Sequence, residues 1–329
     1  MLDTLPPNVQ QIVSAHLDQA DRLILLYMNR RMLTMWIVDV YQNHAFHFTE
    51  QSTQISKYSE HVRHVVYTLD EPITQSTFVN NLRSLQIGGK YNQQIDPGVL
   101  PQTLQSLTFY DSYNQKIAPG VLPPNLHTLI FGFSFKQKID DGVLPSSTQH
   151  LKFGCKYKHK IDVGFLPPNL RFLKFAHRFN QKIEAMLLPP SLKYLIFGYD
   201  FNQTIEVGAL PLGLESLQFG KEYNQNIEVG VLPITLRFLR FGIDHNQKIE
   251  PGVLPHGLEH LMLGPTCNQK IEVGVLPPAL KYLGFGYKFC QKLDSTILPP
   301  GLKTIELHYE YPYIDEVKKI FFGKIRLKR

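Results

Sequence analysis

The chain has 329 residues, of which 43% are hydrophobic and 19% are charged, and its formal net charge is +6 at pH 7. This composition supports a continuous apolar core and excludes an intrinsically disordered chain, which would combine low hydrophobicity with high charge. The mild basic surplus is typical of a solvated surface and does not by itself indicate an acidic partner.

Residues 1–45 carry an apolar pattern with the period of a helix. Val9, Ile12 and Leu17 fall on one face of a predicted first helix, and Asp21 is placed to cap a second helix that carries Leu23. The N-terminus has no signal-peptide pattern, and no apolar run approaches the roughly 18 residues of a membrane span. The sequence therefore predicts a small α-helical module in an intracellular, cytoplasmic protein that does not contact membranes.

Residues 46–70 are interpreted as a linker followed by an N-terminal cap strand around Val65 and Val66. A repeat then occupies residues 71–307, and its clearest marker is a Leu-Pro dipeptide that recurs at a constant interval of 22 residues. The ten leucines of this dipeptide are Leu100, Leu122, Leu144, Leu166, Leu188, Leu210, Leu232, Leu254, Leu276 and Leu298. With a degenerate earlier copy, the repeat amounts to ten or eleven coils, a coil being one 22-residue unit.

Each coil reads as one short strand and an extended return leg. The segment Leu-x-x-Leu-x-Phe, seen at Leu236, Leu239 and Phe241, is typical of a strand whose apolar side chains face inward. Gly242 ends that strand, and the proline of Leu-Pro suits a leg outside the hydrogen-bonded ladder. Stacked coils would bury a shared core, so we predict a solenoid of short parallel β-strands similar to leucine-rich repeats.

Polar residues also form columns along the repeat. An asparagine column that includes Asn202 and Asn224 is expected to bond backbone groups of the adjacent coil. Lysine and acidic columns flank the inward isoleucines and are interpreted as a solvated, mutually neutralising face, with phosphate binding by the lysines as the alternative. The three cysteines, Cys155, Cys267 and Cys290, form no CxxC pair and are expected to be buried thiols.

The unit [YF]-N-Q-K-I-E-x-G-V-L-P-x-x-L-x-x-L-x-F-G resembles the FNIP repeat, a relative of the leucine-rich repeat, over about residues 71–307. Single positions depart from the pattern: Thr148 replaces a leucine, Met186 and Thr296 replace glycines, and Lys158-His159 replace Asn-Gln. We expect these departures to loosen the register locally and to leave the fold intact.

In such a solenoid the outward strand residues are free to vary, and here they include aromatic and basic side chains that packing does not require. Residues of this kind dominate the energy of protein interfaces. We therefore predict a concave target-binding face made by Phe172, Tyr194, Phe238, Tyr282, Arg171, Arg237, Arg240, His150 and His260. The alternative is a row of aromatic side chains that stack along the ladder and stabilise only the sheet.

The N-terminal residues resemble an F-box, which carries Leu-Pro, a helix to a further leucine, an aspartate and a basic pair. These are Leu5-Pro6, Leu17, Asp21 and Arg30-Arg31 here, and Asn29 and Met32 depart from the residues common in that family. An F-box followed by FNIP repeats is an architecture of social amoebae and giant viruses. The resemblance implies that an adaptor of the Skp type, within a cullin ubiquitin ligase, binds Leu5, Pro6, Val9, Ile12, Leu17 and Leu23.

The function predicted from these features is that of a target-recognition subunit of a ubiquitin ligase, monomeric within the complex, without a cofactor, a metal or catalytic residues of its own. Nucleotide-binding loops and hydrolase or metalloprotease motifs are absent from the sequence. One alternative is an interaction scaffold whose N-terminal helices only cap the solenoid. The other is a binder of nucleic acid or anions through the lysine column and the basic tail in residues 308–329, which we interpret as a C-terminal cap with a solvated end.

Overall fold

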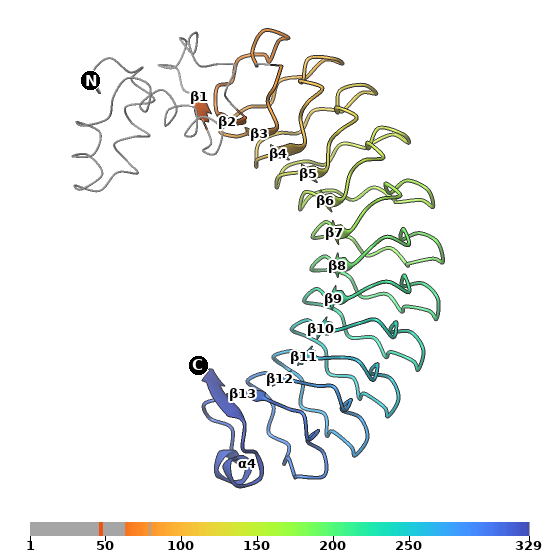
Figure 1. The fold of residues 1–329 in the computed structure, drawn as a ribbon, viewed down its shortest axis with the longest axis vertical. Helices are drawn as coiled ribbons and strands as arrows, with labels where there is room; N and C mark the ends of the chain where they lie inside the picture. The colour runs from red at the N-terminus through yellow and green to blue at the C-terminus, as the bar shows by residue number, and fades with distance from the viewer. Residues whose placement is uncertain (1–45, 49–62, 79, 329) are drawn as a thin grey trace, which may run out of the picture. The chain divides into compact units, whose positions relative to one another are not determined.

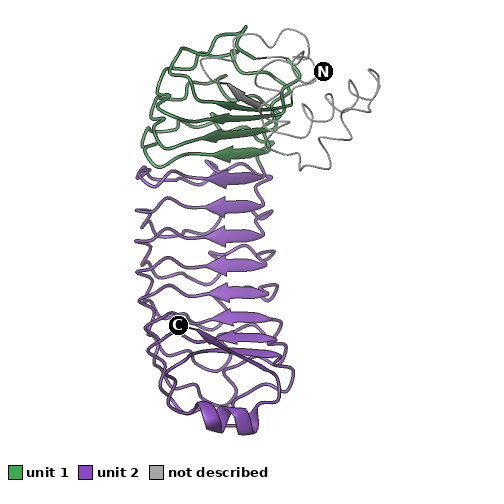
Figure 2. Ribbon diagram, turned by 90° about the vertical axis from the view of Figure 1, so that its left-hand side faces the viewer, with its two compact units in different colours: residues 1–148 green, residues 149–329 purple. Residues whose placement is uncertain are grey.

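The computed structural model describes residues 46–48, 63–78 and 80–328, so the helical module predicted at residues 1–45 lies outside the described residues. The chain divides into two compact units, residues 1–148 and 149–329, coloured green and purple in Figure 2. Both units are built from short parallel β-strands, as the repeat predicted.

In unit 1 the described residues form strands that pair in chain order. These strands are β1 (Phe46–Phe48), β2 (His64–Tyr67), β3 (Ser84–Ile87), β4 (Ser106–Phe109) and β5 (Thr128–Ile130). Leu85, Leu107 and Leu129 face one another across β3, β4 and β5. Because these partners are 22 residues apart in the sequence, each coil adds one strand to the sheet.

Unit 2 continues the same pattern through a longer ladder, and in Figure 1 its strands follow the inner, concave edge of the unit. The strands are β6 (His150–Lys152), β7 (Phe172–Lys174), β8 (Tyr194–Ile196), β9 (Ser216–Gln218), β10 (Phe238–Arg240), β11 (His260–Met262), β12 (Tyr282–Gly284) and β13 (Thr304–His308). Each pairs in parallel with the next along the chain.

The C-terminal residues form a further helix and strand. Helix α4 (Ile314–Ile320) buries Val317, and β14 (Lys324–Lys328) pairs in parallel with β13. The alternation of basic and apolar residues from Lys324 to Lys328 is typical of a strand, so this segment is not the solvated end that its charge suggested. The tail therefore extends the sheet, and its basic side chains line an exposed edge, as edge strands of natural sheets commonly do.

The core consists of columns of identical side-chain type. The central leucines of the strands, such as Leu217 and Leu239, are 0% exposed. The ring of Phe219 lies 5.6 Å from the rings of Phe197 and Phe241 in the adjacent coils and 3.8 Å from Tyr223 in its own coil. Stacking continues the apolar column from coil to coil, so no single coil has to bury its own edge.

The side chains of the asparagine column form hydrogen bonds to the backbone of the adjacent coil, which confirms the structural role expected of them. In unit 2 the backbone N–H of Asn224 donates to Oδ1 of Asn202 over 2.9 Å, and the N–H of Asn246 donates to Oδ1 of Asn224 over 2.9 Å. Nε2 of Gln225 also donates to Oδ1 of Asn202 over 3.0 Å. Each asparagine thus satisfies an amide of the next coil that no strand partner reaches.

Replacing Asn202 with alanine is expected to lower the free energy of unfolding by about 1 kcal/mol, because the half-buried N–H of Asn224 loses its acceptor. The matched control is Asn226→Ala, since that side chain bonds the carboxylate of Glu228 within its own coil. Amide hydrogen exchange gives the measurement. Equal protection of the Asn224 amide in the two variants would contradict this role of the column.

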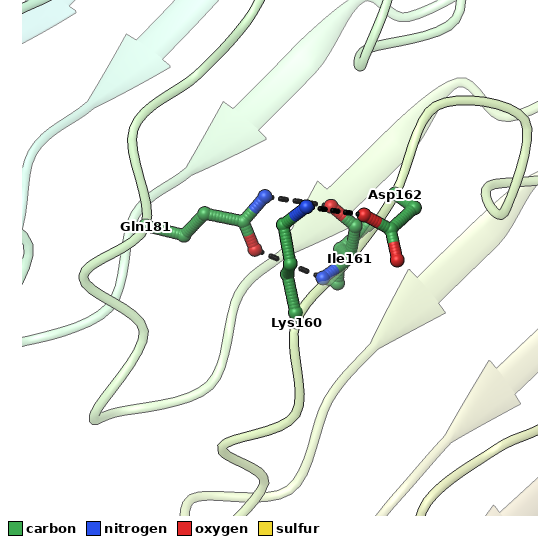
Figure 3. A network of polar contacts seen from close by, with 4 residues as sticks. All are labelled: Lys160, Ile161, Asp162 and Gln181. Atoms are coloured by element: carbon green, nitrogen blue, oxygen red, sulfur yellow. Dashed lines mark hydrogen bonds and ion pairs between the residues drawn. The ribbon is translucent and has the colours of Figure 1, made fainter.

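The column is interrupted where Lys158 and His159 replace Asn and Gln, and a glutamine of the following coil compensates (Figure 3). The side chain of Gln181 accepts from the N–H of Ile161 over 2.9 Å and donates to its carbonyl over 2.6 Å. Beside it, Nζ of Lys160 lies 2.6 Å from a carboxylate oxygen of Asp162. Where the repeat departs from its pattern, a glutamine side chain thus replaces the asparagine side chain in the hydrogen bonds that connect adjacent coils.

The cysteines occupy three different environments, so the expectation of three buried thiols was wrong. Cys267 is buried, Cys155 is half-buried and Cys290 is exposed. Cys290 stands in the asparagine column, whose side chains reach the adjacent coil along the surface of the solenoid, and its N–H donates to Asn268 over 2.9 Å. Cys267 stands in the aromatic column, which points inward, and burial raises the pKa of its thiol.

Candidate protein-binding face

Seven of the nine predicted target-binding residues lie on strands of unit 2, in columns on either side of the buried central leucine, and Arg171 and Arg237 directly precede β7 and β10. Because side chains alternate along a strand, the neighbours of each buried leucine point away from the core. The aromatic column contains Phe172, Phe238 and Tyr282, which are half-buried, and Tyr194, which is 46% exposed. The fold therefore places all four on the same face of the unit 2 ladder, and three of them are less exposed than expected.

Two aromatic clusters form on this face. In the first, the rings of His150 and Phe172 stack 4.0 Å apart, and Tyr194 pairs in register with Phe172. The second contains Phe238, His260 and Tyr282, with centroid distances of 6.2 Å and 5.8 Å along the column. Ser216 of β9 separates the two clusters. The stacking itself stabilises the sheet, and Tyr194 and His260 remain exposed to solvent.

Tyr282 also belongs to a polar network at the end of the ladder. Its hydroxyl donates to Glu306 over 2.6 Å, and Nζ of Lys328 on β14 lies 2.6 Å from the same carboxylate. Burial alone would raise the pKa of Glu306, but the hydrogen bonds from Lys328 and Tyr282, together with the charges of Lys328 and Arg326, outweigh it and lower the pKa. The buried carboxylate is therefore ionised and ties β14 to the face.

The three predicted arginines differ in what they contact. Arg171 and Arg240 are exposed, and neither has an ion pair within the described part of the chain. Arg237 instead donates from Nη1 to the carbonyl oxygen of Gly257 over 2.6 Å. Its guanidinium is thus already used to hold the next coil, so Arg171 and Arg240 are the arginines available to a partner.

The lysine and acidic columns lie outside this face and are largely paired with each other. The ion pairs are Lys116–Asp140, Lys160–Asp162, Lys182–Glu206, Lys248–Glu250 and Lys270–Glu272. All of these groups are substantially exposed, and such surface pairs contribute little to stability. Their geometry is that of the neutralising, solvated face predicted from the sequence.

A groove beside the strand face was not predicted. It has a volume of about 410 Å³ and lies at the ends of strands β9 to β13. Its walls include Arg240 and Met262 on one side and Ile243 and Tyr287 on the other. Two features of the sequence relate to this groove: the residue after each Leu-x-Phe-Gly is variable, and Gly284 interrupts the outward strand column. These two columns of residues become adjacent only when the coil folds.

Among the described residues, no group of three or more His, Cys, Asp or Glu side chains is arranged to hold a metal ion. No helix in that part of the chain has the length and apolar character needed to cross a membrane. The features that distinguish the face are therefore its partly exposed aromatic clusters, two unpaired arginines and the adjoining groove.

Comparison with known proteins agrees with the repeat. A model of the FNIP repeat matches residues 70–112, 113–156, 157–200, 201–244, 245–288 and 268–310. The structure of CroV588, described as a novel circular LRR protein structure, is similar with a TM-score of 0.72 and 37% identity over 80% of this chain and 39% of that chain. This chain thus spans well under half the length of that protein.

An internalin, InlF, from Listeria monocytogenes is similar in fold, with a TM-score of 0.56 and 16% identity over 100% of this chain and 95% of that one. At this identity the likeness concerns the fold alone. A search of curated proteins finds no match.

Proposed function

The chain belongs to the FNIP repeat family, and from this premise we propose that it is a non-catalytic interaction scaffold that binds a target protein on the strand face of unit 2. Solenoids of stacked coils present extended concave surfaces, and this use is common among them. The proposal assigns the binding to the aromatic clusters and the free arginines of that face.

The observation that carries the proposal is the placement of large rings where the fold does not require them. The core is filled by the inward leucine and phenylalanine columns, whose members are almost fully buried. Tyr194 and Phe238 nevertheless stand on the outward side of their strands, and Arg171 and Arg240 lie near them in adjacent columns. Aromatic residues with arginine are the side chains that most often dominate binding energy at protein interfaces.

The double variant Phe172→Ser and Phe238→Ser is expected to weaken target binding by at least about tenfold, because each aromatic cluster loses an anchor. Affinity purification of the full chain followed by quantitative mass spectrometry identifies the partners, and titration of a purified partner measures the loss. Thermal unfolding of the variant shows whether its solenoid is intact.

The matched control is Leu212→Ser with Ile234→Ser, which removes two apolar side chains that are 79% and 81% exposed outside the strand face. This control is expected to keep the partners of the parent chain. Partners that survive the strand-face variant and are lost from the control would overturn the assignment of the binding surface.

We further propose that residues 1–45 bind a Skp-type adaptor, which would make the chain the target-recognition subunit of a cullin ubiquitin ligase. Support comes from the Leu5-Pro6 start, Leu17, Asp21 and the Arg30-Arg31 pair, standing ahead of FNIP repeats. Purified adaptor should be captured by the full chain and lost when residues 1–45 are deleted. No capture by the full chain would overturn the ligase role and leave the scaffold role in place.

A further inference from the structure

The groove beside the strand face is bounded by two columns of side chains and has a glycine-lined floor. One wall is the outward strand column, with Arg240 and Met262, and the other is the column that follows the glycines, with Ile243 and Tyr287. Between them lie Gly242 and Gly286, from which no side chain rises. At β12 the outward strand column holds Gly284, and the neighbouring side chains of Tyr282 and Met262 pack over it.

The ends of the groove differ in charge. At one end the amine of Lys221 lies 5.0 Å from the ring centroid of Tyr199, and the exposed guanidinium of Arg240 has no ion pair within the described residues. At the other end Glu306 is already paired with Lys328 over 2.6 Å. Within the described part of the chain, Lys221 and Arg240 thus form no ion pair with a carboxylate, while Glu306, the acid among the lining residues, is neutralised.

The walls also expose apolar surface to solvent. Ile243 is 42% exposed and Tyr287 is 55% exposed, and the half-buried side chain of Met262 faces them across the floor. Apolar side chains of this size are rarely left in a concave site without a ligand that covers them. A purely ionic ligand would leave these apolar side chains exposed to water. A ligand with both a carboxylate and an apolar group would pair with the cations and also cover the apolar side chains.

We propose that this groove binds an extended acidic segment of the target protein, with a carboxylate at Arg240 and Lys221 and an apolar or aromatic side chain against Met262, Ile243 and Tyr287. The proposal rests on the proposed function, since it names the part of the target that the scaffold recognises. A planar guanidinium suits a carboxylate, to which it can donate two parallel hydrogen bonds.

The length of the groove favours an extended segment. Its lining includes Tyr199 and His308, which belong to coils five steps apart in the repeat. At about 4.8 Å per coil the lining spans roughly 24 Å, which an extended chain of about seven or eight residues covers. The segment would cross the strands and would not add to the sheet, so its recognition depends on side chains.

The experiment selects ligands from a phage-displayed library of random octapeptides on the full chain and measures the selected peptides by fluorescence anisotropy. We expect enrichment of an acidic residue close to a large apolar one. Arg240→Glu should weaken these peptides at least fivefold, and Tyr287→Ala should weaken those with the apolar residue. Exchanging the acidic residue for lysine should restore binding to the Arg240→Glu chain.

The matched control is Arg178→Glu, because Arg178 is also exposed but lies outside both the groove and the strand face. Peptides without acidic enrichment, or peptides that lose the same affinity with Arg178→Glu as with Arg240→Glu, overturn the proposal. If the target still binds through Phe172 and Phe238 in that case, the groove is excluded while the scaffold function stands.

Discussion

Lowering the pH from 7 to 4 is expected to remove about 3 kcal/mol of stability that the variant His245→Phe retains. His245 stands in the aromatic column of the core, is 2% exposed and stacks on Phe241 at 3.9 Å. Neither of its ring nitrogens has a hydrogen-bond partner among the described residues. Burial lowers the pKa of this imidazole from 6.5 to about 4.

The direction of the effect follows from which state binds more protons. Between pH 6.5 and pH 4 the unfolded chain carries a protonated His245 while the folded chain keeps it neutral, given the folded pKa of about 4. Stability is therefore fully present above the unfolded pKa and is lost as the pH falls through this window. Phenylalanine removes the titration, and it also removes two buried nitrogens that lack partners, so His245→Phe should be more stable even at pH 7.

Urea unfolding of the parent chain, of His245→Phe and of the control His256→Gln at pH 7 and pH 4 measures this difference. His256 is exposed, so its replacement is expected to leave the pH dependence of the parent chain unchanged. Carboxylates that titrate near pH 4 affect all three chains alike, and the comparison cancels them. The same acid sensitivity in His245→Phe as in the parent chain would show that the imidazole does not control it.

The repeat made the fold predictable because one physical constraint is copied in every coil. Leu217 and Leu239 must occupy equivalent positions if their coils stack, so a period of 22 residues defines both the strand and its register. The period does not determine whether Cys290 is buried. The asparagine column that contains Cys290 is periodic but lies at the surface. Periodicity alone does not show whether the side chains of a column point into the core or form hydrogen bonds with the next coil at the surface.

The candidate site was predictable only in part for the same reason. The outward aromatic column follows from strand alternation, so Tyr194 and Phe238 could be assigned to one face. The groove depends on how far the coil turns between Arg240 and Ile243, two of the residues that line it. Such details arise from backbone geometry, and a sequence pattern without coordinates does not contain them.

A large loss of stability from a single added methyl group is expected at Gly220. A Cβ atom there would lie 1.7 Å from the carbonyl oxygen of Gly198 in the preceding coil and 2.5 Å from its carbonyl carbon. Backbone atoms cannot rotate aside as a flexible side chain can, so Gly220→Ala must separate two coils that β8 and β9 hold together. We expect a loss of about 3 kcal/mol or more in the free energy of unfolding.

The informative comparison is Gly274→Ala, because that residue needs its glycine for a different reason. Gly274 has a φ of +83° and nothing within 4 Å of an added Cβ, so alanine there costs only the left-handed conformation, about 1–2 kcal/mol. Met186 adopts a φ of 65° at the equivalent position of another coil, so the fold tolerates a residue other than glycine in this left-handed conformation. Ala176 occupies the same position of the repeat as Gly220, so this position does not always require glycine. The cost of Gly220→Ala therefore comes from the short distance between the two coils. If thermal unfolding finds Gly220→Ala no less stable than Gly274→Ala, the close contact between coils is not what requires glycine at this position.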